Sequence, residues 1–416
     1  MVYFPKVEAV KKAQERLRGV SLVTPLKRNE SMSNAYGAEI LFKREDLQVV
    51  RSYKIRGAYN KIASLSPAQK GKGVVCASAG NHAQGVAYSC RRLSIRATIF
   101  MPLPTPAQKI EQVKMFGGEW IDLRLSGDTF DEAKWAAQDF CSHSGAEFIH
   151  PFEDPKVMEG QGTIGLEILA QSKEPIDYLF MPVGGGGLAA GLSAVFKTLS
   201  PHTKLIGVEP LGAPSMSTSL RKMENTFLPR IDKFVDGAAV QKVGDLNFEI
   251  CQHTLDAMLT VEEGRICELM LEMYNKEAIV LEPAAALSIA GLDAFGDDLK
   301  SKRVVCLISG SNNDISRTSE VQERAILYKG LKHYFLVKFP QRPGALREFI
   351  AEVLGPQDDI VYFQYIKRNS RERGAAVVGI ELKAKEQIDP LQRKIRDLGY
   401  FDRYLNESEI LYSVLT

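Results

Sequence analysis

The sequence has 416 residues, a formal net charge of +2, 45% hydrophobic residues and 25% charged residues. This is an ordinary globular composition for two or three domains, with enough apolar residues to build a core without stabilising disulfides. The charges are nearly balanced and form no long run of one sign, which excludes the basic surface typical of proteins that bind nucleic acids or anionic membranes.

The six cysteines are scattered, without a C-x-x-C pair or a metal-ligand spacing. We therefore expect no metal site and a reducing, cytoplasmic compartment. The first residues lack the continuous apolar segment of a signal peptide. The longest apolar run, residues 188–196, is far shorter than the ~20 residues that cross a bilayer, so a soluble protein is expected.

From about residue 72, short β-branched segments alternate with longer helical segments. The predicted strands are 73–78, 96–102, 119–123, 147–151, 178–183, 204–209, 257–261 and 303–309. One of the intervening helical segments, 105–118, begins after small polar residues and ends at two glycines. Strand–helix alternation predicts an α/β fold with parallel sheets covered by helices on both faces. The strands are continuously apolar, as expected when both of their faces are buried.

The pattern changes near residue 326. The remaining order is strand, helix, strand, strand, helix and a possible last strand, which predicts a ferredoxin-like α+β domain. We therefore expect a first domain over residues 1–325, a linker over 326–332 and a second domain over 333–416. A smaller subdomain is expected at about 55–155 within the first domain.

Lys54 lies in the segment SYKIRGAYN, between a tyrosine and an isoleucine. Because most lysines are exposed, a surface position on an amphipathic helix is one interpretation. The alternative is a lysine held away from water, whose pKa is lowered by its apolar neighbours and by nearby cationic groups such as Arg56. Such an amine is free to form a Schiff base.

The segment SAGNHAQG, 78–85, follows a predicted strand directly. Its small residues allow the backbone to approach a ligand, and a helix that begins there offers free N–H groups to an anion. Asn81 adds an amide at this turn. A plain strand–helix turn is the alternative interpretation. We expect His82 to be hydrogen-bonded at the turn rather than catalytic.

The segment PVGGGGL, 182–188, also joins a strand to a helix. Four consecutive glycines cost backbone entropy, which argues against a purely structural role. A glycine-rich turn that opens a helix predicts a phosphate cradle. Gly185, Gly187 and Ala190 also fit the dinucleotide pattern G-x-G-x-x-A, with Glu209 at the end of the next strand, so a dinucleotide site stays open.

The segment CLISGSNND, 306–314, is an apolar strand that ends in small polar residues. Ligands bind at such strand ends in open α/β sheets, and Ser309 offers a neutral hydroxyl to a ring nitrogen. An ordinary turn is the alternative. Three such strand ends and one lysine favour pyridoxal phosphate over NAD. Pyridoxal phosphate needs a Schiff-base lysine, a phosphate cradle and a partner for its ring nitrogen.

These segments, together with EPAAA at 282–286, resemble the fold-type II pyridoxal-phosphate enzymes and, within them, the serine/threonine dehydratases. The resemblance covers roughly residues 15–320 and implies a tryptophan synthase β-like fold with two open parallel-sheet subdomains. The C-terminal segments FPQRPGALREF and GAAVVGIEL resemble the ACT-like regulatory domain of biosynthetic threonine dehydratases. A single such unit is similar to the short form of those enzymes.

The resemblance implies a role for each matching position. Lys54 would carry the cofactor covalently, Asn81 would hold its ring hydroxyl and Ser309 would face its ring nitrogen. The residues implied to cradle the phosphate through backbone N–H groups are Gly184, Gly185, Gly186, Gly187 and Leu188. The residues implied to receive the substrate carboxylate are Ser78, Ala79, Gly80, Asn81 and His82.

Two departures from the family pattern bear on whether the protein racemises its substrate and whether it binds a cation. Racemases of the family carry a second serine where this chain has Ala79, which disfavours racemisation. Metal-dependent relatives carry an aspartate where this chain has Ser215, so Glu209 is not expected to hold a cation.

The resemblance implies dehydration and deamination of L-threonine to 2-oxobutanoate and ammonia, the first step of isoleucine biosynthesis, under allosteric control by isoleucine or valine. An L-serine dehydratase and a catabolic threonine dehydratase are alternatives. An NAD-dependent dehydrogenase and a non-catalytic amino-acid sensor are less favoured. We expect a homodimer or homotetramer, with no nucleic-acid or membrane partner.

Overall fold

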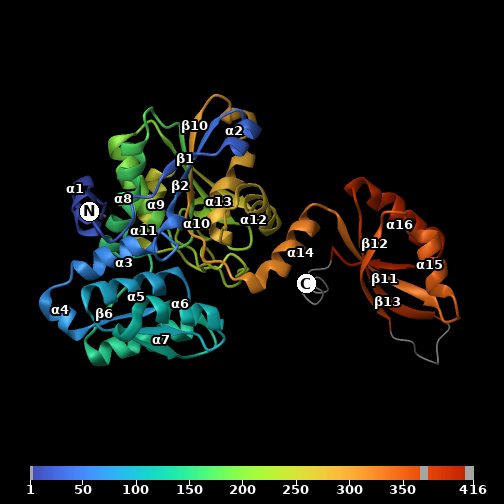
Figure 1. The fold of residues 1–416 in the computed structure, drawn as a ribbon, viewed down its shortest axis with the longest axis horizontal. Helices are drawn as coiled ribbons and strands as arrows, with labels where there is room; N and C mark the ends of the chain where they lie inside the picture. Colours follow the sequence, from blue (N-terminus) through green and yellow to red (C-terminus); the bar gives the residue numbers. More distant parts are fainter. Residues whose placement is uncertain (1–2, 366–372, 408–416) are drawn as a thin grey trace. The chain divides into compact units, whose positions relative to one another are not determined.

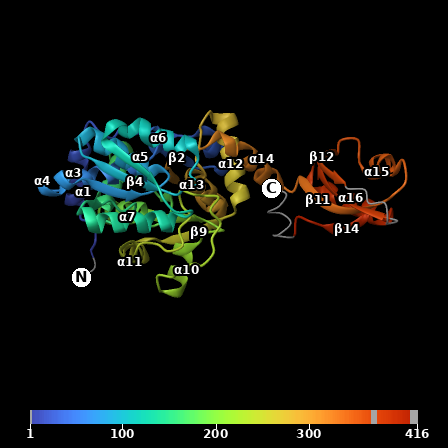
Figure 2. The same ribbon diagram turned by 90° about the horizontal axis from the view of Figure 1, so that it is seen from below.

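The computed structural model describes residues 3–365 and 373–407, and the chain forms two compact units, Met1–Asp314 and Ile315–Thr416 (Figures 1 and 2). The division lies before the expected boundary at residue 325. Helix α14 (Thr318–Tyr328) belongs to the second unit because it packs against strand β11 (Lys332–Pro340). The segment 326–332, expected as a linker, therefore contains the end of one element and the start of the next.

The first unit contains a six-stranded sheet in the order β1-β2-β10-β7-β8-β9. Its strands are β1 (Leu26–Arg28), β2 (Glu39–Arg44), β7 (Tyr178–Pro182), β8 (Lys204–Pro210), β9 (Ala257–Val261) and β10 (Arg303–Ile308). All neighbouring pairs are parallel except β1 with β2. The predicted parallel strands are confirmed. Strands β1 and β2 were not predicted; β2 pairs with the distant β10, a contact that local sequence patterns do not show.

A second sheet in the same unit has the order β5-β4-β3-β6, and all its pairs are parallel. Its strands are β3 (Val74–Ala77), β4 (Ala97–Met101), β5 (Ile121–Leu125) and β6 (Glu147–Phe148). Strand β5 begins two residues later than predicted because Gly118–Trp120 forms a 3-10 turn. This sheet lies within the range expected for the smaller subdomain.

Helices of the first unit surround both sheets (Figure 1). They are α1 (Val7–Leu17), α2 (Glu30–Tyr36), α3 (Lys54–Ala63), α4 (Pro67–Lys72), α5 (Asn81–Leu93), α6 (Ala107–Gly117), α7 (Phe130–Ser144), α8 (Pro155–Gln171), α9 (Gly187–Leu199), α10 (Ser215–Lys222), α11 (Asp245–Thr254), α12 (Glu263–Glu277) and α13 (Pro283–Ala290). Helix α13 packs against β7, β8 and β10, and each of its residues is buried. Helix α8 packs against α1, α3 and α9.

Glycines allow α3 and α8 to pack with their backbones in close contact. A Cβ atom added to Gly160 would lie 2.5 Å from the carbonyl oxygen of Arg56 and 2.7 Å from the Cα atom of Gly57. The N–H of Gly57 donates to Oε1 of Gln161 at 3.2 Å. The position of α3 is therefore set directly by the backbone of α8.

The second unit has the predicted ferredoxin-like order. After β11 come α15 (Ala345–Val353), β12 (Asp359–Tyr365), β13 (Arg373–Glu381), α16 (Ile388–Asp397) and β14 (Phe401–Tyr404). They form an antiparallel sheet in the order β12-β13-β11-β14, and the possible last strand is present as β14. The predicted turn after β12 lies almost entirely outside the described residues. Within the described segments, no helix combines the length and apolar character needed to span a bilayer.

The contact between α3 and α8 gives a stability prediction. Gly160→Ala forces a methyl group against two backbone atoms of α3, so we expect the free energy of unfolding to fall by about 1–3 kcal/mol. Gly71→Ala is the control, because a Cβ atom there meets nothing within 4 Å. This substitution should raise the free energy of unfolding by up to about 1 kcal/mol. Denaturant unfolding of both variants measures the difference. Equal stability of the two variants would contradict the close packing.

Candidate functional site

Lys54 is the first residue of α3, which follows strand β2 in the chain after a 3-10 turn and a loop. Its Nζ atom donates to the carbonyl oxygen of Pro151 at 2.9 Å and lies 5.3 Å from the centre of the Tyr53 ring. Burial lowers the pKa of the amine from 10.5 to about 8, while the negative charge of Glu282 opposes that shift. A larger fraction of this amine is therefore neutral near pH 7 than of an ordinary lysine. The residue is partly buried, so a fully exposed position on the surface of an amphipathic helix does not describe it.

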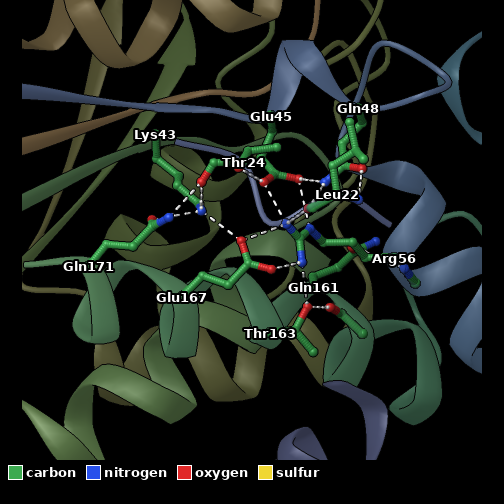
Figure 3. Close-up of polar contacts among 12 residues, drawn as sticks. Leu22, Thr24, Lys43, Glu45, Gln48, Arg56, Gln161, Thr163, Glu167 and Gln171 are labelled. Carbon is green, nitrogen blue, oxygen red and sulfur yellow. Dashed lines mark hydrogen bonds and ion pairs between the residues drawn. The ribbon is translucent and has the colours of Figure 1, made fainter. Parts of the chain in front are cut away.

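Arg56 does not act on Lys54 as the sequence suggested. Its guanidinium forms ion pairs with Glu45 and Glu167 in a buried cluster (Figure 3), which neutralises its charge. Residues two apart on a helix point about 200° away from each other, so Arg56 and Lys54 face different surroundings. The expectation that Arg56 lowers the pKa of Lys54 is wrong; the cause is burial.

Asn81 lies at the start of α5 and bonds two residues that are distant in sequence, Glu282 before α13 and Asn312 after β10. Its Nδ2 atom donates to both carboxylate oxygens of Glu282, at 2.9 and 2.8 Å. Its Oδ1 atom accepts from Nδ2 of Asn312 at 2.6 Å. Burial raises the pKa of Glu282 to about 7, and the hydrogen bond from Asn81 opposes that rise. Glu282 thus belongs to the polar network around Asn81.

Glu282 was not predicted as a site residue. The available signal was an acidic residue directly before Pro283, which starts a helix of small apolar residues. The Glu282 side chain does not cap that helix, so it is left for other partners. Gly310 permits the approach of its carboxylate, because a Cβ atom there would lie 2.5 Å from Oε1 of Glu282.

The glycine loop joins β7 to α9, with Gly186 at φ +85° as the N-cap. The backbone N–H groups of residues 184–189 donate a hydrogen bond to no described residue. The glycines are also required by packing: a Cβ atom on Gly185 would lie 2.3 Å from the ring of Phe152, and one on Gly187 would lie 2.4 Å from the Phe152 carbonyl. The loop therefore combines close packing with unbonded donors at a helix N-terminus, where an anion binds well.

The turn at 78–82 also leaves backbone N–H groups unbonded at the start of a helix. The Ser78 hydroxyl accepts from the N–H of Gly80 at 3.2 Å, whereas the N–H groups of Ala79, Asn81 and His82 bond to no described residue. The His82 ring nitrogen Nε2 lies 2.8 Å from the carbonyl oxygen of Ile149. Burial lowers the pKa of His82 to about 3, so the ring is neutral. These features fit anion binding by the backbone and a structural histidine.

Ser309 follows strand β10 and is 1% exposed, yet its hydroxyl has no hydrogen-bond partner among the described residues. Ser52, which forms an isolated β-bridge with Gly310, also has a buried hydroxyl without a described partner. Leaving a buried hydroxyl unpaired is unfavourable by about 1–3 kcal/mol. The carbonyl oxygen of Ser309 accepts from the N–H of Tyr53 at 3.1 Å, which places this strand end beside Lys54.

Glu209 has a local role. Its carboxylate accepts the N–H groups of Met216 at 2.6 Å and Ser217 at 2.9 Å, in the first turn of α10. It therefore acts as a helix cap and is not available for the ribose of a dinucleotide. The hydroxyl of Ser215 donates to the carbonyl of Val240. In the part of the chain that the structure describes, no group of three or more His, Cys, Asp or Glu side chains could hold a metal ion.

The structure brings the predicted segments to one place. Pro151 contacts Lys54, the next residue Phe152 packs on the glycine loop, and Ser309 is bonded to the residue before Lys54. An amine of lowered pKa, unbonded N–H donors at a helix start and an unpaired buried hydroxyl fit pyridoxal phosphate. A dinucleotide would use neither the lysine nor the lone hydroxyl.

Two family descriptions match the sequence. The family described as "Pyridoxal-phosphate dependent enzyme" matches residues 18–310. The family described as "C-terminal regulatory domain of Threonine dehydratase" matches residues 323–415.

Similar proteins cover almost the whole chain. The biosynthetic L-threonine dehydratase of Halalkalibacterium halodurans is 50% identical over 410 residues, covering 99% of each chain. That of Bacillus subtilis is 50% identical over 410 residues, covering 99% of this chain and 97% of its own. Among solved structures, the processed threonine deaminase isoform 2 of Solanum lycopersicum has a TM-score of 0.74 and 41% identity, covering 79% of this chain and 92% of its own. Maize serine racemase has a TM-score of 0.71 and 29% identity, covering 78% and 99%.

The influence of the Glu282 charge on Lys54 gives a pH prediction. Glu282→Gln removes the charge that stabilises the Lys54 ammonium, so the pKa of Lys54 should fall below about 8. Below about pH 7 the wild-type carboxyl is itself protonated, so variant and wild type should differ only as the pH rises above that value. The pH dependence of Lys54 acetylation, followed by mass spectrometry, measures the shift.

Glu209→Gln is the matched control, because burial also raises the pKa of Glu209 to about 7 but this carboxyl does not act on Lys54. We expect Lys54 to titrate in this variant as in the wild type. An unchanged Lys54 titration in Glu282→Gln would contradict the prediction.

Proposed function

Since the chain belongs to the pyridoxal-phosphate-dependent enzymes and, within them, to the family of the biosynthetic threonine dehydratases, we propose that it converts L-threonine to 2-oxobutanoate and ammonia. The hydroxyl group of threonine leaves as water, and the resulting enamine takes up water and releases ammonia. The observation that carries the proposal is geometric: the Lys54 amine bonds the Pro151 carbonyl, and the next residue, Phe152, packs on a glycine loop whose N–H groups have no described partner.

The residues at this site would hold the cofactor from several directions. Lys54 would bind it covalently, and Ser309 would offer its unpaired hydroxyl to the ring nitrogen. Asn81 would face the ring hydroxyl from the start of α5. The residues proposed to bind the phosphate through backbone N–H groups are Gly184, Gly185, Gly186, Gly187 and Leu188. When bound, pyridoxal phosphate supplies a conjugated ring that accepts the electron pair left at the substrate α-carbon.

Backbone groups of this chain would then position the substrate, and Lys54 would move its proton. The unbonded N–H groups at the start of α5, in the segment 78–82, would receive the substrate carboxylate. The Nζ atom of Lys54, once free, would take the α-proton as general base, which suits a pKa of about 8. Ala79 has no hydroxyl to return a proton from another direction, which favours elimination over racemisation.

We propose further that the second unit binds a branched-chain amino acid, isoleucine or valine, and adjusts the activity. Its match to a regulatory-domain family supports this role. The turn before α15 offers a place for a ligand, because Gly344 has φ +87° and no atom within 4 Å of an added Cβ. Such domains act across symmetric interfaces, so we propose a homodimer or homotetramer. The described cysteines are all free thiols, which supports a cytoplasmic location.

Replacing Lys54 tests the central assignment. Lys54→Ala should abolish the visible absorption of the bound cofactor and the release of 2-oxobutanoate from L-threonine, because no other amine takes its place. Lys61→Ala is the control: Lys61 lies on the same helix but pairs with Glu147 and Asp154. Assays with L-threonine and L-serine, for all three proteins, also decide the substrate. A Lys54→Ala variant with near-normal turnover would refute the proposal.

The regulatory role predicts that isoleucine or valine shifts the threonine saturation curve of the full-length protein. A coupling free energy of ~1–3 kcal/mol would correspond to a 5- to 150-fold change in apparent affinity. Gly344→Val strains the start of α15 and should reduce this response. Gly399→Val is the control, since Gly399 has φ +73° and equal open space at the end of α16. Identical curves with and without both amino acids would leave the domain a purely structural role.

A further inference from the structure

Four charged side chains are buried together behind the start of α3 (Figure 3). Lys43 and Glu45 are fully buried, and the side chains of Arg56 and Glu167 are 1% and 5% exposed. Two positive and two negative charges balance, so the cluster is neutral. Lys43 belongs to β2, Glu45 to the 3-10 turn η1 (Glu45–Leu47) and Glu167 to α8.

Arg56 is the centre of this cluster, and its guanidinium forms a bidentate pair with each of the two carboxylates. Its Nε and Nη2 atoms each lie 2.8 Å from an oxygen of Glu45. Its Nη1 and Nη2 atoms lie 2.7 and 2.9 Å from the oxygens of Glu167. Nη1 also donates to Thr163 Oγ1, and Nη2 to the carbonyl of Leu22, both at 3.1 Å. Only a planar guanidinium can satisfy this arrangement.

These contacts fix the turn of α3 that carries Lys54. The helix begins at Lys54, and its N-cap residue Tyr53 makes no capping side-chain bond. We infer that Arg56 is the positioning residue that holds the first turn of α3 against η1 and α8, and so holds the Lys54 amine at the Pro151 carbonyl. This inference rests on the proposed role of Lys54. Arg56 does not touch the site itself; it acts through the two intervening peptide units.

Stability alone is a weak reason for such a cluster. Apolar side chains of similar volume are often as stable as a buried ion pair, or more so. What apolar side chains cannot supply is the directional hold of two bidentate pairs. Gly57 and Gly160 support the same geometry, because they bring the α3 backbone close enough for Arg56 to reach Thr163 and Glu167.

Lys43 provides a matched control within the cluster. Its Nζ atom bonds Glu167 Oε2 and the carbonyl of Thr24, each at 2.6 Å, and Gln171 Oε1 at 3.1 Å. It is as buried as Arg56 and shares Glu167 with it. It lies on β2, however, and has no covalent path to Lys54 through α3.

Four groups lie around the Lys54 amine. The pKa of this amine depends on its distance from them and from water, so the titration of Lys54 reports on where the amine is held. Glu282 acts on it with negative charge, and Tyr53 lies under it with its ring. His82 from α5 and His150 after β6 are close enough to be affected by it, but burial keeps both neutral. The described hydrogen bonds of the Arg56 guanidinium go to none of these four side chains, so replacing it removes no direct bond to them.

The experiment compares full-length wild type, Arg56→Lys and Lys43→Met. Each protein is freed of cofactor, and pyridoxal phosphate is added at a series of pH values while visible absorption reports covalent binding at Lys54. In Arg56→Lys the amine is held loosely and water reaches it, so the pH midpoint of binding should move up from about 8 toward 10.5. The kcat for L-threonine should fall about 10- to 100-fold, more than KM changes.

Lys43→Met should lower the thermal unfolding midpoint but leave the pH midpoint and kcat as in the wild type. If Arg56→Lys matches the wild type, or if Lys43→Met shifts the pH midpoint equally, the inference is overturned. If Arg56→Lys does not fold, Thr163→Val removes one bond to Arg56, and a smaller shift in the same direction supports the inference while none overturns it. Failure of the wild type itself to bind pyridoxal phosphate at Lys54 would instead overturn the proposed function.

Discussion

The close contact between α3 and α8 is the constraint on which the candidate site depends. Helix α8 begins directly after the segment that carries Pro151 and Phe152, and Asp154 caps it by accepting two backbone N–H groups. Pro151 receives the Lys54 amine, and Phe152 supports the glycine loop. The same helix start thus sets the lysine and the phosphate-binding loop relative to each other. A shift of α8 would move both.

The electrostatics of the site follow from burial more than from neighbouring charges. Burial raises the pKa of Glu282, lowers those of His82 and His150 and lowers that of Lys54. Each shift favours the uncharged form of the group. The buried cluster around Arg56 does carry full charges, but its two positive and two negative groups balance. The surroundings of Lys54 are therefore polar but carry little net charge, which suits a neutral amine.

Much of the fold could be predicted because the parallel strands are short, apolar and followed by distinctive turns. Strand β9 agrees with its predicted bounds to the residue. Strand β2 escaped prediction because its partner β10 lies far along the chain. Strand β1 has only three residues and pairs with β2 at the edge of the sheet, so its sequence is too short to show a strand pattern.

Some parts of the candidate site could be predicted from the sequence, and others could not. Lys54, the glycine loop and Ser309 stand in recognisable local patterns, and the structure gathers them. The partners of Asn81 and the direction of the Arg56 side chain depend on tertiary packing. Glu282 meets Asn81 only because Gly310 leaves space for its carboxylate. The Arg56 side chain points away from Lys54 because it pairs with the buried carboxylates of Glu45 and Glu167.

The pairing of β2 with β10 also bears on how the chain can fold during synthesis. All four strands of the smaller sheet lie between Val74 and Phe148, so that sheet can form while the ribosome is still elongating the chain. Strand β2 must wait for Ile308 before its central partner exists. Until then one edge of β2 is unpaired, and an unpaired edge is prone to join other strands. The N-terminal segment of the nascent chain is therefore one place where protection by a chaperone would matter.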